Sequence, residues 1–236
     1  VSSSPTLQDK YSKRSGSLRF SATTLNLGRL AGNETRKDTI LIFNTASRPV
    51  TIAADSKMPA CIELSIGHAS IEPGTESWIA ISYNAVVKND FGFVLDRILL
   101  TTNDSIQPQK YINISATIHE YFPPLNTDDS ALVQRARIPE LNFNYGTLVQ
   151  GEKVSHDFKI FNDGTRDLLI HKAKSNCGCI HTTLSKQVIA AGDSAFVRVD
   201  FDSFGKEGKD NRTIDLYLND PARPEVKLEI AGEIRK

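Results

Sequence analysis

The chain has 236 residues, and its 28 lysines and arginines balance 28 aspartates and glutamates, so the formal net charge at pH 7 is zero. This balance, together with the lack of a basic run with interleaved aromatic residues, argues against nucleic-acid binding. No stretch of the chain approaches the roughly 20 apolar residues that a membrane-spanning helix requires.

The first residues are rich in serine and carry charges of both signs. This composition predicts a flexible N-terminal leader over residues 1–16 rather than a strand. The chain begins at Val1 without a methionine. We therefore expect a trimmed terminus, with any signal peptide or lipid anchor lying upstream of it.

Two landmarks recur at an offset of 118 residues along the chain. Gly28 is matched by Gly146, and Ile42-Phe43-Asn44 is matched by Ile160-Phe161-Asn162. A single offset over this length predicts two copies of one domain rather than a solenoid of short units. We place the copies at residues 17–120 and 138–236.

The segment between the two copies, residues 121–137, is predicted to be a linker. Its proline pair, Pro123-Pro124, stiffens its start. The run from Asp128 to Arg137 is compatible with a short helical turn.

Alternation of apolar and polar residues predicts strands at matching places in both copies. The residues expected on the buried faces of the first copy are Ile79, Ile81, Tyr83, Ile98, Leu100, Ile112 and Ile114. Those of the second copy are Val154, Phe158, Ile160, Leu168, Ile170, Ala195, Val197, Val199, Phe201, Ile214, Leu216, Leu218, Val226, Leu228 and Ile230. Short strands at regular spacing with turn residues between them predict an all-β protein of two tandem immunoglobulin-like β-sandwich domains.

The second copy carries a further pattern, in which Phe143-Asn144-Tyr145-Gly146 is followed by Cys177-Gly178-Cys179 and by a closing Ile230-Ala231-Gly232. With this pattern, residues 138–236 resemble the bacterial domain of unknown function 1573. That family is related to the immunoglobulin-like modules of the ASPM, SPD-2 and Hydin group and to the major sperm protein fold. The first copy is a diverged repeat, since Ala60-Cys61 stands where Gly178-Cys179 is expected. The resemblance implies no activity, but it implies an exported bacterial envelope protein, often a lipoprotein.

One group of side chains in the sequence is able to bind a metal or carry out redox chemistry, and it consists of Cys177, Cys179 and His181. Alternate residues of a strand share a face, and such a Cys₂His set would suit copper(I) or zinc. Alternate Cα atoms of an extended strand are about 6.5 Å apart, so two sulfur ligands for one ion need a backbone fold at Gly178. The same fold would allow a small, easily reduced disulfide. The third interpretation is that Cys179 packs in the core as a small apolar residue.

Comparison of the two copies favours the packing interpretation for Cys179. Cys61 lies opposite Cys179, whereas Pro59 lies opposite Cys177. The Cys179 position therefore accepts a cysteine in a copy that has no cysteine pair, and the role of Cys177 stays open.

Four sites read Asp, then Ser or Thr, then a small or aliphatic residue, and they resemble the O-glycosylation acceptor motif of exported Bacteroides-type proteins. The alternative interpretation is that Asp-Ser simply opens turns and strands. The four acceptor residues are Thr39, Ser105, Ser130 and Ser194.

No nucleophile elbow, phosphate-binding glycine loop or zinc-protease motif occurs, which predicts that the protein is not an enzyme. We interpret the chain as a binding or scaffolding protein of a bacterial cell envelope, periplasmic or associated with the outer membrane, with an unidentified protein or glycan partner. The alternative is a metal-binding or redox protein that uses the Cys-Gly-Cys motif. A weaker alternative is an intracellular eukaryotic member of the superfamily associated with the cytoskeleton.

Overall fold

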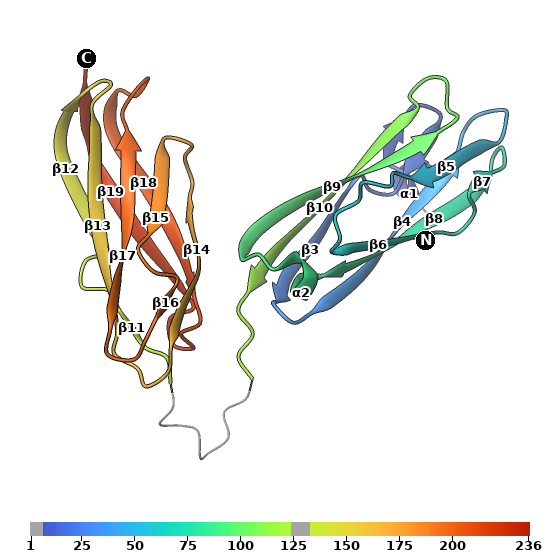
Figure 1. The fold of residues 1–236 in the computed structure, drawn as a ribbon. Helices are drawn as coiled ribbons and strands as arrows, with labels where there is room; N and C mark the ends of the chain where they lie inside the picture. The colour runs from blue at the N-terminus through green and yellow to red at the C-terminus, as the bar shows by residue number, and fades with distance from the viewer. Residues whose placement is uncertain (1–6, 124–132) are drawn as a thin grey trace, which may run out of the picture. The chain divides into compact units, whose positions relative to one another are not determined.

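The computed structural model describes residues 7–123 and 133–236 of the chain. The chain divides into two units, residues 1–119 and 120–236, which we call domain 1 and domain 2 (Figure 1). Each is a sandwich of two β-sheets around its own apolar core. The predicted all-β architecture of two tandem sandwiches is thereby confirmed. No helix in the described residues is long and apolar enough to cross a membrane.

In domain 1, one sheet has the strand order β1-β2-β4-β8-β6 and the other has the order β3-β10-β9-β5-β7. Strand β3 runs parallel to β10, and the other pairs are antiparallel. The elements are α1 (Leu7–Lys10), β1 (Lys13–Ser15), β2 (Leu18–Phe20), β3 (Thr24–Ala31), β4 (Thr35–Asn44), β5 (Val50–Ala54), β6 (Ile62–Ile66), β7 (Ser70–Ile71), β8 (Glu76–Asn84), α2 (Ala85–Lys88), β9 (Gly92–Thr102) and β10 (Gln109–His119).

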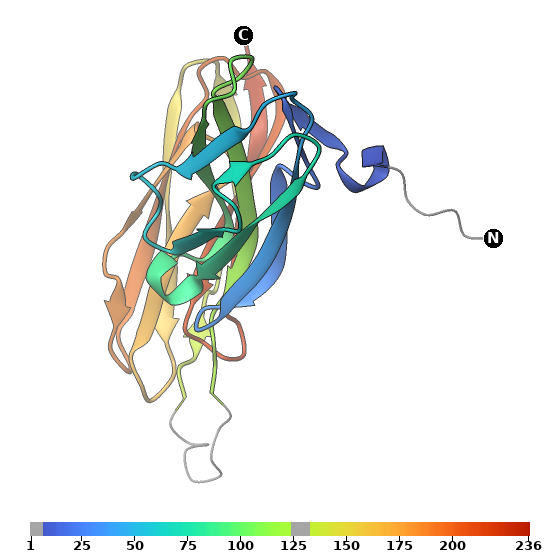
Figure 2. The same cartoon turned by 90° about the vertical axis from the view of Figure 1, so that its right-hand side faces the viewer.

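Domain 2 repeats this arrangement, with the sheet orders β11-β13-β17-β15 and β12-β19-β18-β14-β16. The two views of the ribbon show these strands running along the length of the sandwich (Figures 1 and 2). The elements are β11 (Ala136–Arg137), β12 (Asn142–Val149), β13 (Lys153–Asn162), β14 (Leu168–Ser175), β15 (Ile180–Leu184), β16 (Val188–Ile189), β17 (Ser194–Asp202), β18 (Gly208–Leu218) and β19 (Glu225–Arg235).

The predicted strand phases are confirmed in both domains. Every apolar residue expected on a buried face is buried in the structure, with the exception of Val154, which is half-buried and packs against the core of domain 2. The alternating pattern of a sandwich strand was therefore a sufficient signal for its inward face.

The prediction of a flexible leader over residues 1–16 is wrong for residues 7–16, the part of it that the structure describes. Helix α1 and strand β1 form there, β1 pairs with β2, and Tyr11 is buried with its ring centroid 5.5 Å from that of Phe43. Composition alone did not reveal this structure, because strand β2 and the ring of Phe43, against which the segment packs, lie further along the chain. Residues 1–6 lie outside the described part of the chain.

The end of the predicted linker also differs from the expectation. The Thr165 N–H donates to the Val133 carbonyl and the Asp163 N–H donates to the Arg135 carbonyl, so residues 133–137 extend alongside domain 2 rather than forming a helical turn. These bonds place the start of domain 2 before residue 138. The rest of the predicted helical turn, residues 128–132, lies outside the described residues.

A buried asparagine at the end of strand β4 fixes the loops at one end of domain 1. The side-chain amide of Asn44 donates to the carbonyls of Arg48 and Ile71 at 2.9 and 2.8 Å, and its oxygen accepts the Ala46 N–H at 2.8 Å. Asn162 makes the matching bonds in domain 2, to the carbonyls of Arg166 and Ile189 and from the Gly164 N–H. We call these two residues the asparagine clamps.

Domain 1 also holds a buried ion pair. The Lys110 ammonium lies 2.6 Å from the Asp104 carboxylate, and both side chains are 1% exposed. Burial alone would raise the pKa of Asp104, but hydrogen bonds from Lys110 and from the backbone N–H groups of Ser17 and Ile106 outweigh it and hold that pKa well below its ordinary value. The lysine additionally donates to the Ser15 carbonyl, which ties β1 to the sandwich.

The first prediction concerns the asparagine clamp of domain 1. Asn44→Ala leaves two carbonyls and one N–H without a partner in a buried place, so we expect the free energy of unfolding to fall by about 3 kcal/mol. Trp78, the only tryptophan, lies in domain 1, and its fluorescence in a urea titration should therefore report the loss. Asn162→Ala is the matched control and should leave the tryptophan transition in place while shifting the transition seen by circular dichroism.

The second prediction concerns pH. Because the pKa of Asp104 is lower in the folded than in the unfolded chain, its stabilising effect is present above the unfolded value of about 3.9 and is lost as the pH falls below it. We expect the urea midpoint of Trp78 fluorescence to fall between pH 5 and pH 2. Asp104→Asn should lower the free energy of unfolding at pH 7 by about 3 kcal/mol, which lowers the urea midpoint. It should also flatten the pH dependence of that midpoint. A urea midpoint that falls between pH 5 and pH 2 as steeply in Asp104→Asn as in the wild type would contradict the role of Asp104.

Candidate functional site at the Cys-Gly-Cys turn

The three residues of the Cys-Gly-Cys motif lie in a turn that joins β14 to β15. The Ile180 N–H donates to the Cys177 carbonyl at 3.2 Å, and the Asp202 N–H donates to the Cys179 carbonyl at 3.0 Å. Cys177 and Cys179 are joined by a disulfide, with their Cα atoms 5.2 Å apart. The backbone fold required at Gly178 for a short sulfur-to-sulfur approach is therefore present.

Domain 1 forms the same turn without a disulfide. The Ile62 N–H donates to the Pro59 carbonyl at 2.9 Å, and the Asn84 N–H donates to the Cys61 carbonyl at 2.8 Å. Each of these four residues lies 118 positions before its counterpart in domain 2. The turn is thus a property of the fold, and the disulfide is an addition to it.

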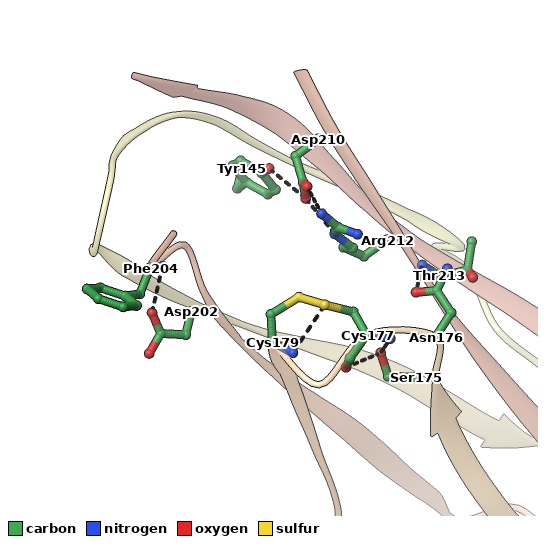
Figure 3. The surroundings of a disulfide bond; sticks show 10 residues. All are labelled: Tyr145, Ser175, Asn176, Cys177, Cys179, Asp202, Phe204, Asp210, Arg212 and Thr213. Carbon is green, nitrogen blue, oxygen red and sulfur yellow. Dashed lines mark hydrogen bonds and ion pairs between the residues drawn. A yellow bond between two sulfur atoms is a disulfide. The ribbon is translucent and has the colours of Figure 1, made fainter. Parts of the chain in front are cut away.

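Hydrogen bonds hold the turn of domain 2 from inside. The Ser175 hydroxyl accepts the Cys177 N–H at 3.0 Å and donates to the Cys177 carbonyl at 3.1 Å. The Cys179 N–H lies 3.1 Å from the Cys177 sulfur, directed at it as a donor (Figure 3). The Asn176 N–H donates to the carbonyl of Thr213 on β18. Ser175 was not among the site residues expected from the sequence, although a serine two residues before a turn residue is a recognised backbone-bonding signal.

A hollow of about 370 Å³ lies beside the disulfide. Two polar contacts border it: Lys153 lies 3.1 Å from Asp202, and the Ser155 hydroxyl donates to Asp200 at 2.5 Å. The backbone N–H of Phe204 and the ammonium of Lys153 hold the pKa of Asp202 below its ordinary value. The hollow is lined by Lys153, Ser155, Gly178, Cys179, His181, Asp200, Phe201 and Asp202.

Aromatic and charged side chains surround the disulfide in Figure 3. Phe204 follows Asp202 in the chain and is 79% exposed. The Tyr145 hydroxyl donates to Asp210, which also pairs with Arg212. Burial, followed by the nearby Asp210 carboxylate, raises the pKa of Tyr145 to about 12. Tyr145 is therefore a neutral hydrogen-bond donor at physiological pH.

The structure brings Cys179 and His181 to the same hollow, but it does not build a metal site from them. The sulfur atoms are bonded to each other and so are not thiolate ligands for copper or zinc. No group of three or more histidine, cysteine, aspartate or glutamate side chains in the described residues is arranged to hold a metal ion. His181 is exposed on β15.

The packing interpretation fits Cys61 best. Cys61 is a free thiol, 4% exposed, and burial raises its pKa. Cys179 is half-buried and packs against the core of domain 2 while its sulfur takes part in the disulfide. The two cysteines therefore share a position in the fold but not a chemical state.

Three of the four predicted glycosylation acceptors lie in the described residues. Thr39 on β4, Ser105 in the loop before β10 and Ser194 at the start of β17 are all exposed. Ser130 lies outside the described residues. The motif aspartate before Ser105 is Asp104, whose burial gives it a structural role of its own.

A family model described as "Protein of unknown function (DUF1573)" matches the chain over residues 18–118 and 136–234. One range lies in each domain, so both copies match the family model, the diverged first copy included. No curated protein matches the chain.

The chain is similar to two solved structures, the first of which has the same fold. A protein of unknown function from Porphyromonas gingivalis is 17% identical, with 92% of this chain and 100% of that chain covered and a TM-score of 0.62. The ASH or PapD-like domain of human CEP192 is 13% identical, with 49% of this chain and 94% of that chain covered and a TM-score of 0.36.

The third prediction tests whether the backbone of the turn is enough to bring two cysteines together as a disulfide. Because domain 1 forms the same turn, Pro59→Cys places a cysteine opposite Cys177, and we expect it to bridge to Cys61. Thiol titration of the unfolded, non-reduced protein should then fall from one thiol per chain to none. Two titratable thiols would contradict the prediction.

A control substitution belongs to the same experiment. A Cβ built on Gly178 meets no atom within 4 Å, and Ala60 occupies the equivalent place in domain 1. Gly178→Ala should therefore leave the disulfide of domain 2 intact, with the wild-type count of one thiol per chain.

Proposed function

The chain belongs to the DUF1573 family through both of its domains, and from this we propose that it is a non-enzymatic binding or scaffolding protein of a bacterial cell envelope. The partner is a protein whose extended segment adds to an open strand edge of a sandwich. The observation that carries the proposal is the incomplete pairing of strand β13.

Strand β13 has ten residues, but β11 pairs with only two of them, Phe161 and Asn162. Residues 153–160 pair with β17 on one side and with no strand of the described residues on the other. An open edge of this kind offers main-chain donors and acceptors to an incoming strand.

The direction of the backbone identifies the residues that face this edge. On the β17 side, the Asn162 N–H donates to the Asp193 carbonyl and the Asn162 carbonyl accepts from the Gly192 N–H. The Asp163 N–H donates to the Arg135 carbonyl on the opposite side. Because successive residues of a strand alternate in direction, the N–H and carbonyl groups of Ser155, Asp157 and Lys159 are directed at the open edge.

The equivalent edge in domain 1 is shorter. The Ser21 N–H donates to the Leu41 carbonyl at 2.9 Å, and the Leu41 N–H donates to the Ser21 hydroxyl at 3.0 Å. The counterpart of Ser21 in domain 2 is Pro139, which has no N–H to donate. The carbonyl of Lys159, the counterpart of Leu41, is thus left available to a partner, and we place the docking edge on domain 2.

Three observations support an envelope location. The Cys177–Cys179 disulfide is typical of oxidising compartments, such as the bacterial periplasm. The described glycosylation acceptors, Thr39, Ser105 and Ser194, are accessible. The exported character of the resembling family members points the same way.

A second candidate function is thiol–disulfide chemistry at the Cys-Gly-Cys turn, which the disulfide itself favours. The bridged sulfurs favour it over the metal-binding alternative. The disulfide also disfavours an intracellular cytoskeletal role, because thiols stay reduced in that compartment.

The fourth prediction tests docking at β13 in the native cell. A photo-reactive amino acid at position 155 should give covalent adducts with a partner in the envelope fraction on irradiation. The same amino acid in place of Arg198, which lies on β17 between two paired strands, should give none. Equal labelling from both positions, or adducts found only in the cytoplasmic fraction, would overturn the proposal.

Asp157→Pro tests main-chain recognition, and Asp157→Ala is its control for the loss of the ion pair with Arg198. Proline removes the N–H at the open edge and is tolerated where that N–H faces solvent. We expect the variant to keep the circular dichroism of the wild type and to lose at least ten-fold of the labelling from position 155. Labelling that survives this substitution would show that the partner does not pair with the backbone of β13.

A further inference from the structure

The disulfide of domain 2 is not needed to form its turn, as the matching hydrogen bonds around Pro59 and Cys61 in domain 1 show. It closes a ring with a single residue between its cysteines, and so short a loop removes little conformational entropy from the unfolded chain. Both arguments indicate that domain 2 stays folded when the disulfide is reduced. The bond is therefore able to open and close within the native protein.

The disulfide is also accessible. Gly178 is exposed, both cysteines are half-buried, and the 370 Å³ hollow borders the turn on the Cys179 side. Exposed disulfides are typically more oxidising than the buried structural ones of secreted proteins.

The two sulfur atoms are not equivalent. The Cys179 N–H is directed at the Cys177 sulfur at 3.1 Å, and a donor in this place stabilises a thiolate on Cys177. Cys179 lines the hollow, whereas Cys177 does not. The cysteine that lines the hollow and the cysteine whose sulfur is best able to leave are therefore different residues.

We propose that Cys177 and Cys179 form a thiol–disulfide exchange site in which an external thiol attacks Cys179 and Cys177 is the leaving group. The incoming thiolate forms a new S–S bond to the Cys179 sulfur. The Cys177–Cys179 bond breaks, and its electron pair passes to the Cys177 sulfur, which becomes a thiolate beside the Cys179 N–H.

A second thiol completes the reduction. Its thiolate attacks the sulfur of the first thiol in the mixed disulfide, and Cys179 leaves as a thiolate. The two protons released by the external thiols pass to the two cysteines. One external disulfide is formed for each protein disulfide reduced, and the reverse sequence oxidises a dithiol partner.

The chemical class of the co-reactant is a thiol, either a small molecule or a cysteine of a peptide. Phe204, which is 79% exposed, belongs to the surroundings of the disulfide in Figure 3. An apolar side chain in this place adds contact area for a peptide but little for a small hydrophilic thiol.

The test is a trapping experiment on the full, oxidised chain. A limiting amount of glutathione is added, exposed thiols are alkylated after short times, and the peptide that holds both cysteines is fragmented in a mass spectrometer. We expect glutathione on Cys179 and the alkyl group on Cys177, in at least ten-fold excess over the reverse arrangement. Attachment mainly to Cys177, or exchange only under conditions that abolish the native circular dichroism, would overturn the proposal.

Two single variants test the leaving-group assignment independently. Cys179→Ser keeps the N–H at position 179 beside the Cys177 thiol, whereas Cys177→Ser leaves the Cys179 thiol without that donor. The pH at half-maximal reactivity with an aromatic disulfide reagent should be lower for Cys179→Ser. Identical profiles would contradict the assignment, and Cys61, which is buried, is the unreactive internal control.

The source of the thiol is distinguished by Phe204→Ser. With a cysteine-containing apolar peptide as the reductant, a rate loss of about three-fold or more, with glutathione unaffected, assigns a peptide thiol. Equal rates for the variant and the wild type with both reductants assign a small thiol. The circular dichroism of the variant serves as the folding control.

Discussion

Each sandwich depends on the asparagine clamp at the end of its second long strand. Asn44 and Asn162 each satisfy two backbone carbonyls and one backbone N–H in a place that water does not reach. A buried polar group is tolerable only when its hydrogen bonds are complete, so the clamp specifies the surrounding loops closely. With those loops fixed, the strands on either side of them hold one register in both domains.

Much of the fold could be predicted because sandwich strands encode their faces locally. The alternation around Val197 and Val199 identified a buried face without knowledge of the partner strand. Segments that depend on distant partners could not be read in this way. Tyr11 looked like part of a polar leader because the ring that covers it, Phe43, belongs to a strand formed much later in the chain.

The state of Cys177 was left open for a related reason. Alternate Cα atoms of an ideal strand lie about 6.5 Å apart, and the turn that shortens this separation to 5.2 Å depends on a backbone bond from Ile180. The presence of Pro59 at the equivalent place was a signal of this turn, since proline is common in turns. What distinguishes the domains chemically, a disulfide and Pro139 beside an open edge, is confined to a few residues on an otherwise shared frame.

The open edge of β13 also bears on how the protein behaves at high concentration. Lys159 is exposed on this edge strand, whereas the Asp157 carboxylate is already paired with Arg198 on β17 at 2.8 Å. Charged residues on an edge strand are a common protection against self-assembly. The exposed lysine thus discourages the chain from pairing with itself, while a foreign segment with an acidic residue opposite Lys159 would gain a favourable contact.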